Sequence, residues 1–158
     1  MDSISTDTTG DLLKKDDANA LYIINDKGTS DTSDDETIAL VDQWGGTPTF
    51  NWSDSGGSGD YAYSHSSSAY AVESFNDNGT DKFLLAIKIS DTFGGQTETF
   101  WETFVIKESS SGAGDWALDW SSGTWSKNIG KKESVFGQDI DGGGIYDCLL
   151  YTSPSPRD

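Results

Sequence analysis

Residues 70–90 read YAVESFNDNGTDKFLLAIKIS, and this stretch decides the fold. Two runs rich in β-branched and aromatic residues flank Asn78-Gly79, a dipeptide that supplies the positive φ angles of a tight two-residue turn. In the second run Leu85, Ile87 and Ile89 are spaced two apart, so an extended strand would place them on one face. The stretch therefore predicts an antiparallel hairpin with one apolar face.

Similar apolar runs lie on both sides of this hairpin: residues 21–25 (LYIIN), 37–43 (TIALVDQ) and 97–108 (TETFWETFVIKE). In the last run Phe100, Phe104 and Ile106 have one phase, whereas Trp101 and Val105 have the other. This pattern indicates a central strand that is at least partly buried on both faces. Gly, Asn and Asp clusters separate the runs, and their spacing is not helical. We expect an all-β fold, either an antiparallel β-sandwich or a compact barrel of hairpins.

The chain carries 27 acidic against 10 basic residues, a net charge of −17. A polyanion repels phosphate backbones and anionic lipid, so this charge disfavours binding to nucleic acid or to a membrane surface. No long apolar run predicts membrane insertion, and no signal-peptide pattern is present. The richness in Gly, Ser, Thr and Asp nevertheless suggests an extracellular or cell-surface location. We expect Met1 to be an internal methionine, or a start chosen in gene prediction, rather than the true start.

The last residues, 148–158 (CLLYTSPSPRD), match a translated transposase end used in sequencing libraries. We expect them to be an adapter-derived artefact and exclude them from the fold; the alternative is a natural disordered Ser-Pro tail. This exclusion removes Cys148, the only cysteine, so no disulfide framework is expected. Residues 1–36 are predicted to end a linker and form a first hairpin, and residues 37–147 the main part of the same domain.

A degenerate EF-hand-like or dockerin-like acidic loop is predicted where residues 139–144 read DIDGGG. Alternating carboxylates at Asp139 and Asp141 can both point at a hard cation, and the backbone of Gly143 would add a ligand. The third carboxylate of such loops is replaced by Gly143, and the twelfth position falls on Leu150. The prediction is a weak calcium site, with an ordinary polar turn as the alternative.

Three tryptophans, Trp116, Trp120 and Trp125, form the densest aromatic cluster. Large aromatic residues supply the core of many β domains, and exposed indoles provide platforms for neutral glycans. Core packing is the first interpretation of the three, and glycan stacking is the second. The sole histidine, His65, lies in a polar stretch without a nucleophile elbow, so we expect an exposed loop histidine and no catalytic residue.

The blocks LDWSSGTW at residues 118–125 and ESVFGQD at residues 133–139 resemble the Synechocystis-type tryptophan-rich C-terminal domain family. The resemblance implies tandem copies within a large secreted or surface protein, so neighbouring copies of the same domain are expected partners. It implies no enzyme activity, because the family has none assigned. The family loop usually has Asp where this chain has Gly143, which puts metal binding at that loop in doubt.

These observations predict a non-catalytic extracellular repeat module with a structural or adhesive role, stiffened by calcium at its closing loop. The alternative function is a carbohydrate-binding module that binds extracellular polysaccharide on its tryptophans. A third interpretation is an accessory module of an enzyme whose catalytic domain lies elsewhere.

Overall fold

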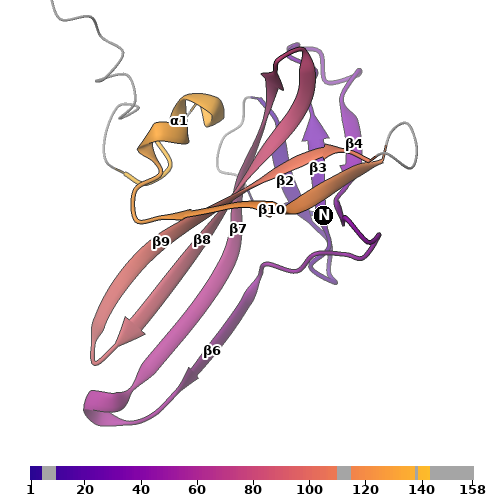
Figure 1. Cartoon of the computed structure of the whole chain (residues 1–158). Helices are drawn as coiled ribbons and strands as arrows, with labels where there is room; N and C mark the ends of the chain where they lie inside the picture. The colour runs from indigo at the N-terminus through magenta and orange to yellow at the C-terminus, as the bar shows by residue number, and fades with distance from the viewer. Residues whose placement is uncertain (5–9, 110–114, 138, 143–158) are drawn as a thin grey trace, which may run out of the picture.

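The computed structural model describes residues 1–4, 10–109, 115–137 and 139–142 (Figure 1). These residues form two β-sheets, one 3-10 turn (η1, Gly59–Tyr61) and one short helix (α1, Gly130–Phe136). The predicted all-β fold is confirmed. No helix among the described residues is long and apolar enough to cross a membrane.

The smaller sheet has four antiparallel strands in the order β1-β2-β3-β4. Its strands are β1 (Asp2–Ser3), β2 (Leu12–Lys15), β3 (Leu21–Asn25) and β4 (Glu36–Ala39). The predicted run at residues 21–25 forms β3 with the same bounds. Alternate β3 side chains, Leu21 and Ile23, are almost fully buried, as the alternation of a strand with one core face requires.

The larger sheet has six strands in the order β5-β10-β9-β8-β7-β6, antiparallel except where β5 runs parallel to β10. Its strands are β5 (Val41–Asp42), β6 (Trp52–Gly56), β7 (Tyr63–Asp77), β8 (Thr80–Phe93), β9 (Gln96–Glu108) and β10 (Trp116–Ser126). The predicted hairpin is confirmed: β7 and β8 meet at Asn78 and Gly79, whose φ angles are 52° and 90°. Strand β9 is central, as predicted, because β8 and β10 flank it.

The apolar run at residues 37–43 forms two strands rather than one. The run is divided at Leu40 into β4, which belongs to the smaller sheet, and β5, which belongs to the larger one. Leu40 is buried, and its backbone N–H donates to the carbonyl of Leu21 over 2.9 Å. The chain therefore passes from one sheet to the other at this residue while its side chain stays in the core.

The main core lies between the two sheets. Its buried residues come from both sheets and from the segment that links them: Leu13, Leu21, Ile23, Ile38, Leu40, Phe50, Ala69, Val72, Phe83, Leu85, Ile87, Phe104, Ile106 and Leu118. The predicted face of Leu85, Ile87 and Ile89 contributes to it, with Ile89 only partly buried. The strands of the larger sheet extend well past the smaller sheet (Figure 1).

The opposite face of the larger sheet carries a second apolar cluster, which includes α1. Trp101 of β9 packs there with Ile129, Phe136 and Ile140, and Val105 packs against the same cluster. The two phases of residues 97–108 are thus buried on opposite faces, as the sequence predicts. Helix α1, which was not predicted from the sequence, adds a third layer (Figure 1).

Candidate functional site

The first candidate site is a group of three carboxylates after β10. Glu133 lies in the first turn of α1, whereas Asp139 and Asp141 follow the helix. Each carboxylate offers one oxygen, and these oxygens lie within 4.8 Å of one another. The helix ends at Gly137, whose φ of 65° turns the chain back so that its N–H donates to the Glu133 carbonyl over 2.9 Å. This turn brings Asp139 and Asp141 beside Glu133.

Glu133 is fully buried at 0% exposure. Its Oε1 accepts hydrogen bonds from the backbone N–H of Ile140, at 2.7 Å, and of Asp141, at 3.1 Å. Its Oε2 is also buried, and within the described part of the chain it has no hydrogen-bond partner. A buried carboxylate oxygen without a donor is costly, so this atom needs an explanation.

Two of these three carboxylates, Asp139 and Asp141, were predicted from the sequence. Asp139 is exposed, and its Oδ1 accepts from the N–H of Gly142 over 2.8 Å. Asp141 is half-buried, and its Oδ2 accepts from the N–H of Ile129 over 3.3 Å. The predicted backbone ligand, Gly143, lies outside the described residues. Glu133 was missed because it precedes the acidic loop and belongs to a helix that the short ESVF pattern did not indicate.

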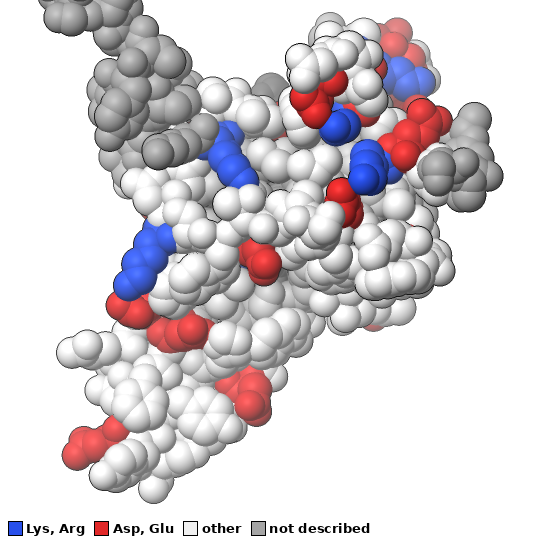
Figure 2. Space-filling model, in the orientation of Figure 1, with Lys and Arg blue, Asp and Glu red and all other residues white. Residues whose placement is uncertain are grey.

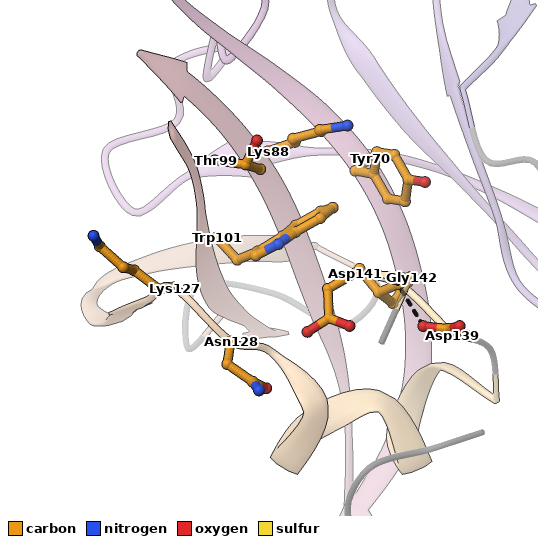
Figure 3. Close-up of a pocket in the computed structure, with 10 residues that line it drawn as sticks. Tyr70, Lys88, Thr99, Trp101, Lys127, Asn128, Asp139, Asp141 and Gly142 are labelled. Atoms are coloured by element: carbon orange, nitrogen blue, oxygen red, sulfur yellow. Dashed lines mark hydrogen bonds between the residues drawn. The ribbon is translucent and has the colours of Figure 1, made fainter. Parts of the chain in front are cut away.

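A cavity of about 580 Å³ adjoins this carboxylate cluster. Figure 3 shows Asp139, Asp141 and Gly142 along one wall, while Tyr70 of β7, Lys88 of β8 and Trp101 of β9 come from the sheet. The Tyr70 and Trp101 rings meet edge to face at 5.0 Å, and Lys88 Nζ lies 5.7 Å and 5.8 Å from their centroids. The ammonium is therefore held by cation–π contacts on this wall.

A β-bulge in β7 explains the position of Tyr70. The register between β7 and β8 shifts between Ala69 and Ala71, so Tyr70 is the extra residue. Ala69 and Val72 contribute to the core between the sheets, whereas Tyr70 and Ala71 both contribute to the cluster under α1. Two consecutive side chains thus leave on the same face, and one of them supplies an aromatic ring to the cavity.

Two of the predicted tryptophans pack against the main core. Trp116 meets Phe83 edge to face at 4.8 Å. Trp120 contacts Phe50 at 5.6 Å and Phe104 at 5.4 Å between ring centroids. Both rings are half-buried, and these contacts support the packing interpretation.

A wide bulge in β10 separates Trp120 from Trp125, since the register with β9 shifts between Asp119 and Thr124. The Ser122 hydroxyl bridges the bulge: it accepts from the N–H of Val105 at 2.7 Å and donates to the carbonyl of Asp119 at 2.6 Å. Gly123 is required there, because a Cβ would lie 2.9 Å from the Phe104 ring. Within the LDWSSGTW block, the alternation of side chains between the two faces of β10 is therefore shifted.

Trp125 has a different environment from the other two. It is 58% exposed, and one side of its ring stacks on Phe100 at 4.5 Å with an interplanar angle of 17°. At the other edge of the larger sheet, Trp52 is 47% exposed and rests on the His65 ring at 4.7 Å. Each indole is thus held by a second ring while part of its surface faces solvent.

The register places both indoles on one face of the sheet. Trp125 pairs with Glu102 and Trp52 with Ser67, and directly paired residues share a face. The exposed rings Tyr63 and Phe93, which pair with each other, extend the same face toward the end of the strands. We call this surface the distal face; its aromatic residues are Trp52, Tyr63, His65, Phe93, Phe100 and Trp125.

Carboxylates lie between these rings. Pairing places Asp54, Asp91, Glu98 and Glu102 on the distal face. Lys127 reaches it too, because its Nζ lies 3.1 Å from Glu98 Oε1 and 5.3 Å from the Phe100 centroid. Burial raises the pKa of Glu102. In the view of Figure 2 the projecting arm of the sheet shows acidic side chains, and the basic ones lie nearer the middle and top.

The expectation that His65 lies in a loop is wrong. His65 is part of β7, and its Nδ1 hydrogen-bonds to Asp91 Oδ1 of the neighbouring β8 strand. Serines flank it in sequence, but strand alternation points the adjacent side chains to the other face. Among the described residues no serine hydroxyl hydrogen-bonds to His65. The pair fixes the ring that supports Trp52.

Two further acids have a structural role between the sheets. Asp11, 1% exposed, accepts from the N–H of Asp26 at 3.0 Å and of Ser74 at 2.6 Å, which ties the smaller sheet to β7. Glu73 lies beside it, and burial, followed by the negative charge of Asp11, raises the pKa of Glu73 to about 8. The hydrogen bonds of Asp11 therefore connect the smaller sheet with the larger one.

In comparisons with known proteins, no family model, no curated protein and no solved structure matches this chain. The resemblance to the tryptophan-rich family stays a prediction.

Proposed function

We propose that this domain is a non-catalytic adhesive module of a secreted or cell-surface protein, and that it binds neutral polysaccharide on the distal face. The observation that supports this function is the set of exposed rings, led by Trp52 and Trp125, on one face of the larger sheet. The C–H groups of a sugar ring stack on aromatic faces, and its hydroxyls donate hydrogen bonds to carboxylates such as Asp54.

The ligand is an oligomer rather than a single sugar. Trp52 lies on β6 and Trp125 on β10, and three strands separate them. At about 4.8 Å per strand the two indoles are roughly 19 Å apart along the sheet, which only a chain of several sugar units spans. The supporting contacts from His65 and Phe100 fix the rings before binding, so less conformational entropy is lost.

The ligand is uncharged. The distal face carries more carboxylates than ammonium groups, and the chain has a net charge of −17. Acidic polysaccharides and nucleic acids would meet repulsion at this surface. Neutral glucans, xylans, mannans and galactans meet none, and their hydroxyls match the carboxylate oxygens.

Affinity electrophoresis of the full chain in gels containing each of these four neutral polysaccharides tests the proposal. Retardation by at least one of them is expected, together with a shift of indole fluorescence. The double variant Trp52→Ala, Trp125→Ala should lose retardation, whereas Trp44→Ala should keep it. Trp44 is the matched control, because it is 75% exposed and lies in the turn after β5, outside the distal face.

Equal retardation of wild type and the double variant would contradict the proposal. A second candidate function uses the same rings: a neighbouring copy of the domain could cover the distal face, so that the module is structural. Self-association of wild type in sedimentation, lost in the double variant, together with no retardation by any neutral polysaccharide, would favour that structural function.

A further inference from the structure

The segment after β10 contains a feature that polysaccharide binding does not use. Glu133, Asp139 and Asp141 bring three carboxylate oxygens within 4.8 Å of one another. Like charges this close repel, and the repulsion grows where water is excluded. Acidic clusters are common in a chain of this charge, so their proximity alone would not identify a ligand.

The buried oxygen of Glu133 is the independent observation. Oε1 is satisfied by two backbone N–H groups, those of Ile140 and Asp141, whereas Oε2 is buried without a partner in the part of the chain that the structure describes. No described lysine forms an ion pair with Glu133. Two lysines line the adjoining cavity, but Lys88 is held over the Tyr70 and Trp101 rings and Lys127 pairs with Glu98.

We infer that Glu133, Asp139 and Asp141 form a binding site for a hard divalent cation, with calcium as the class of ion that fits. Calcium takes six to eight oxygen ligands in flexible geometry, and carboxylates of both binding modes are common among them. The three side chains supply part of this set. The cavity of about 580 Å³ beside Asp139 and Asp141 has room for waters that complete it.

This site differs from the loop that the sequence predicts. In an EF-hand-like loop, Asp139 would be the first ligand and all other ligands would follow it in sequence. The closing carboxylate would come from the twelfth position of the loop. Here the third carboxylate is that of Glu133, which precedes the loop in sequence. The turn at Gly137 brings the loop back beside this helix residue. The loop lacks its own third carboxylate, because Gly143 stands where the family usually has Asp. Glu133 supplies a third carboxylate in its place.

A cation at this site would fasten the C-terminal segment to the larger sheet. Ile129, Phe136 and Ile140 already pack on Trp101, and Lys132 of α1 donates a hydrogen bond to Thr103 of β9. A helix of seven residues is marginal on its own, so its stability depends on such tertiary contacts. The inference is independent of polysaccharide binding, since the distal face lies on the other side of the sheet.

Terbium luminescence and calcium titration on the full chain test the site. Terbium replaces calcium, and Trp101 lines the same cavity as Asp139 and Asp141, so excitation of indole should sensitise terbium emission that calcium then displaces. Isothermal titration at 0.15 M salt should give a calcium dissociation constant on the order of 10⁻⁴–10⁻³ M, the range of extracellular modules. Calcium should also raise the melting temperature.

Two variants and one control decide the outcome. Glu133→Gln and Asp139→Asn should each weaken calcium binding at least tenfold; Asp139 is exposed, so its replacement leaves folding intact. Asp17→Asn removes the same charge from an exposed turn of the smaller sheet and should bind calcium like wild type. No calcium binding by folded wild type at 5 mM, or equal binding by wild type and Asp139→Asn, would overturn the inference.

Discussion

The two ends of the larger sheet have the same strands and the same alternation but different surroundings. Near the smaller sheet, Leu85 of β8 is 0% exposed, with the main core on one side of the sheet and α1 on the other. Along the same strand and face, Ile89 is half-buried and Phe93 is 63% exposed. Apolar residues of this face therefore continue beyond the part of the sheet that the described core covers.

This difference shows that apolar alternation alone does not distinguish core from binding surface. At the covered end, apolar side chains lower the free energy of the fold by leaving water. At the distal end the same kind of side chain stays in water, and exposed apolar patches are typical of interaction surfaces, which is the basis of the proposed function. Substitutions at the two ends should therefore separate stability from binding.

The largest effect is expected at the covered end. Leu85→Ala should lower the free energy of unfolding by about 3–4 kcal/mol, because a fully buried leucine leaves a cavity in a packed core. Ile89→Ala on the same face should cost about 1 kcal/mol, since Ile89 is only partly buried. Urea denaturation measures both. Equal losses would mean that the core extends farther along the strand.

Loss of the hydrogen bonds that Asp11 accepts between the two sheets should have the next largest effect on stability. Asp11→Ala leaves the N–H groups of Asp26 and Ser74 without their acceptor, which should lower the free energy of unfolding by about 2–3 kcal/mol. Asp11→Asn keeps one acceptor oxygen and should lose less. An unchanged midpoint for Asp11→Ala in thermal denaturation would show that the smaller sheet is held by apolar packing alone.

The covered end was the more predictable of the two. The β7–β8 hairpin follows from a local signal, since Asn78-Gly79 determines the turn and the alternation determines the faces. The division of residues 37–43 at Leu40 could not be predicted, because both halves are strands and only tertiary packing sends them into different sheets. Helix α1 was missed because seven residues are too few for a helical period to emerge.

The candidate sites were predictable only in part. Trp120 and Trp125 have similar neighbours in sequence, yet Trp120 packs against the core and Trp125 is exposed, because the bulge over residues 119–124 changes the phase between them. Trp52 could not be predicted as a residue of the distal face, because its β6 neighbours are polar and β6 is an edge strand. Glu133 precedes the acidic loop, and only the turn at Gly137 brings it back.

A smaller effect, whose size depends on pH, is expected for Glu73. Its pKa rises from 4.5 to about 8 on folding, so the folded state holds a proton that the unfolded state has lost between these values. Its contribution to stability is full below pH 4.5 and falls as the pH rises toward 8. Since the side chain is half-buried, solvent screening reduces the effect to about 1–2 kcal/mol.

Glu73→Gln removes this titration. The variant should be more stable than wild type at pH 8.5 by about 1–2 kcal/mol and nearly equal to it at pH 4. Glu98→Gln is the control, because Glu98 lies on the exposed distal face. Urea denaturation at the two pH values measures the difference. A Glu73→Gln variant that is less stable at pH 8.5 would show that the charged form of Glu73 stabilises the fold.

The smallest effect on stability is expected at the distal end. Phe93→Ser should change the free energy of unfolding by less than about 0.5 kcal/mol, because the ring is already largely in water and its strand pairing is retained. If the distal face binds polysaccharide, the same variant should weaken retardation in the gel that retards wild type. A loss of 2 kcal/mol or more in urea would mean instead that Phe93 is buried in solution, as it would be at an interface between copies. The two ends of the sheet would then differ in what covers them, and the exposed rings would have a structural rather than an adhesive function.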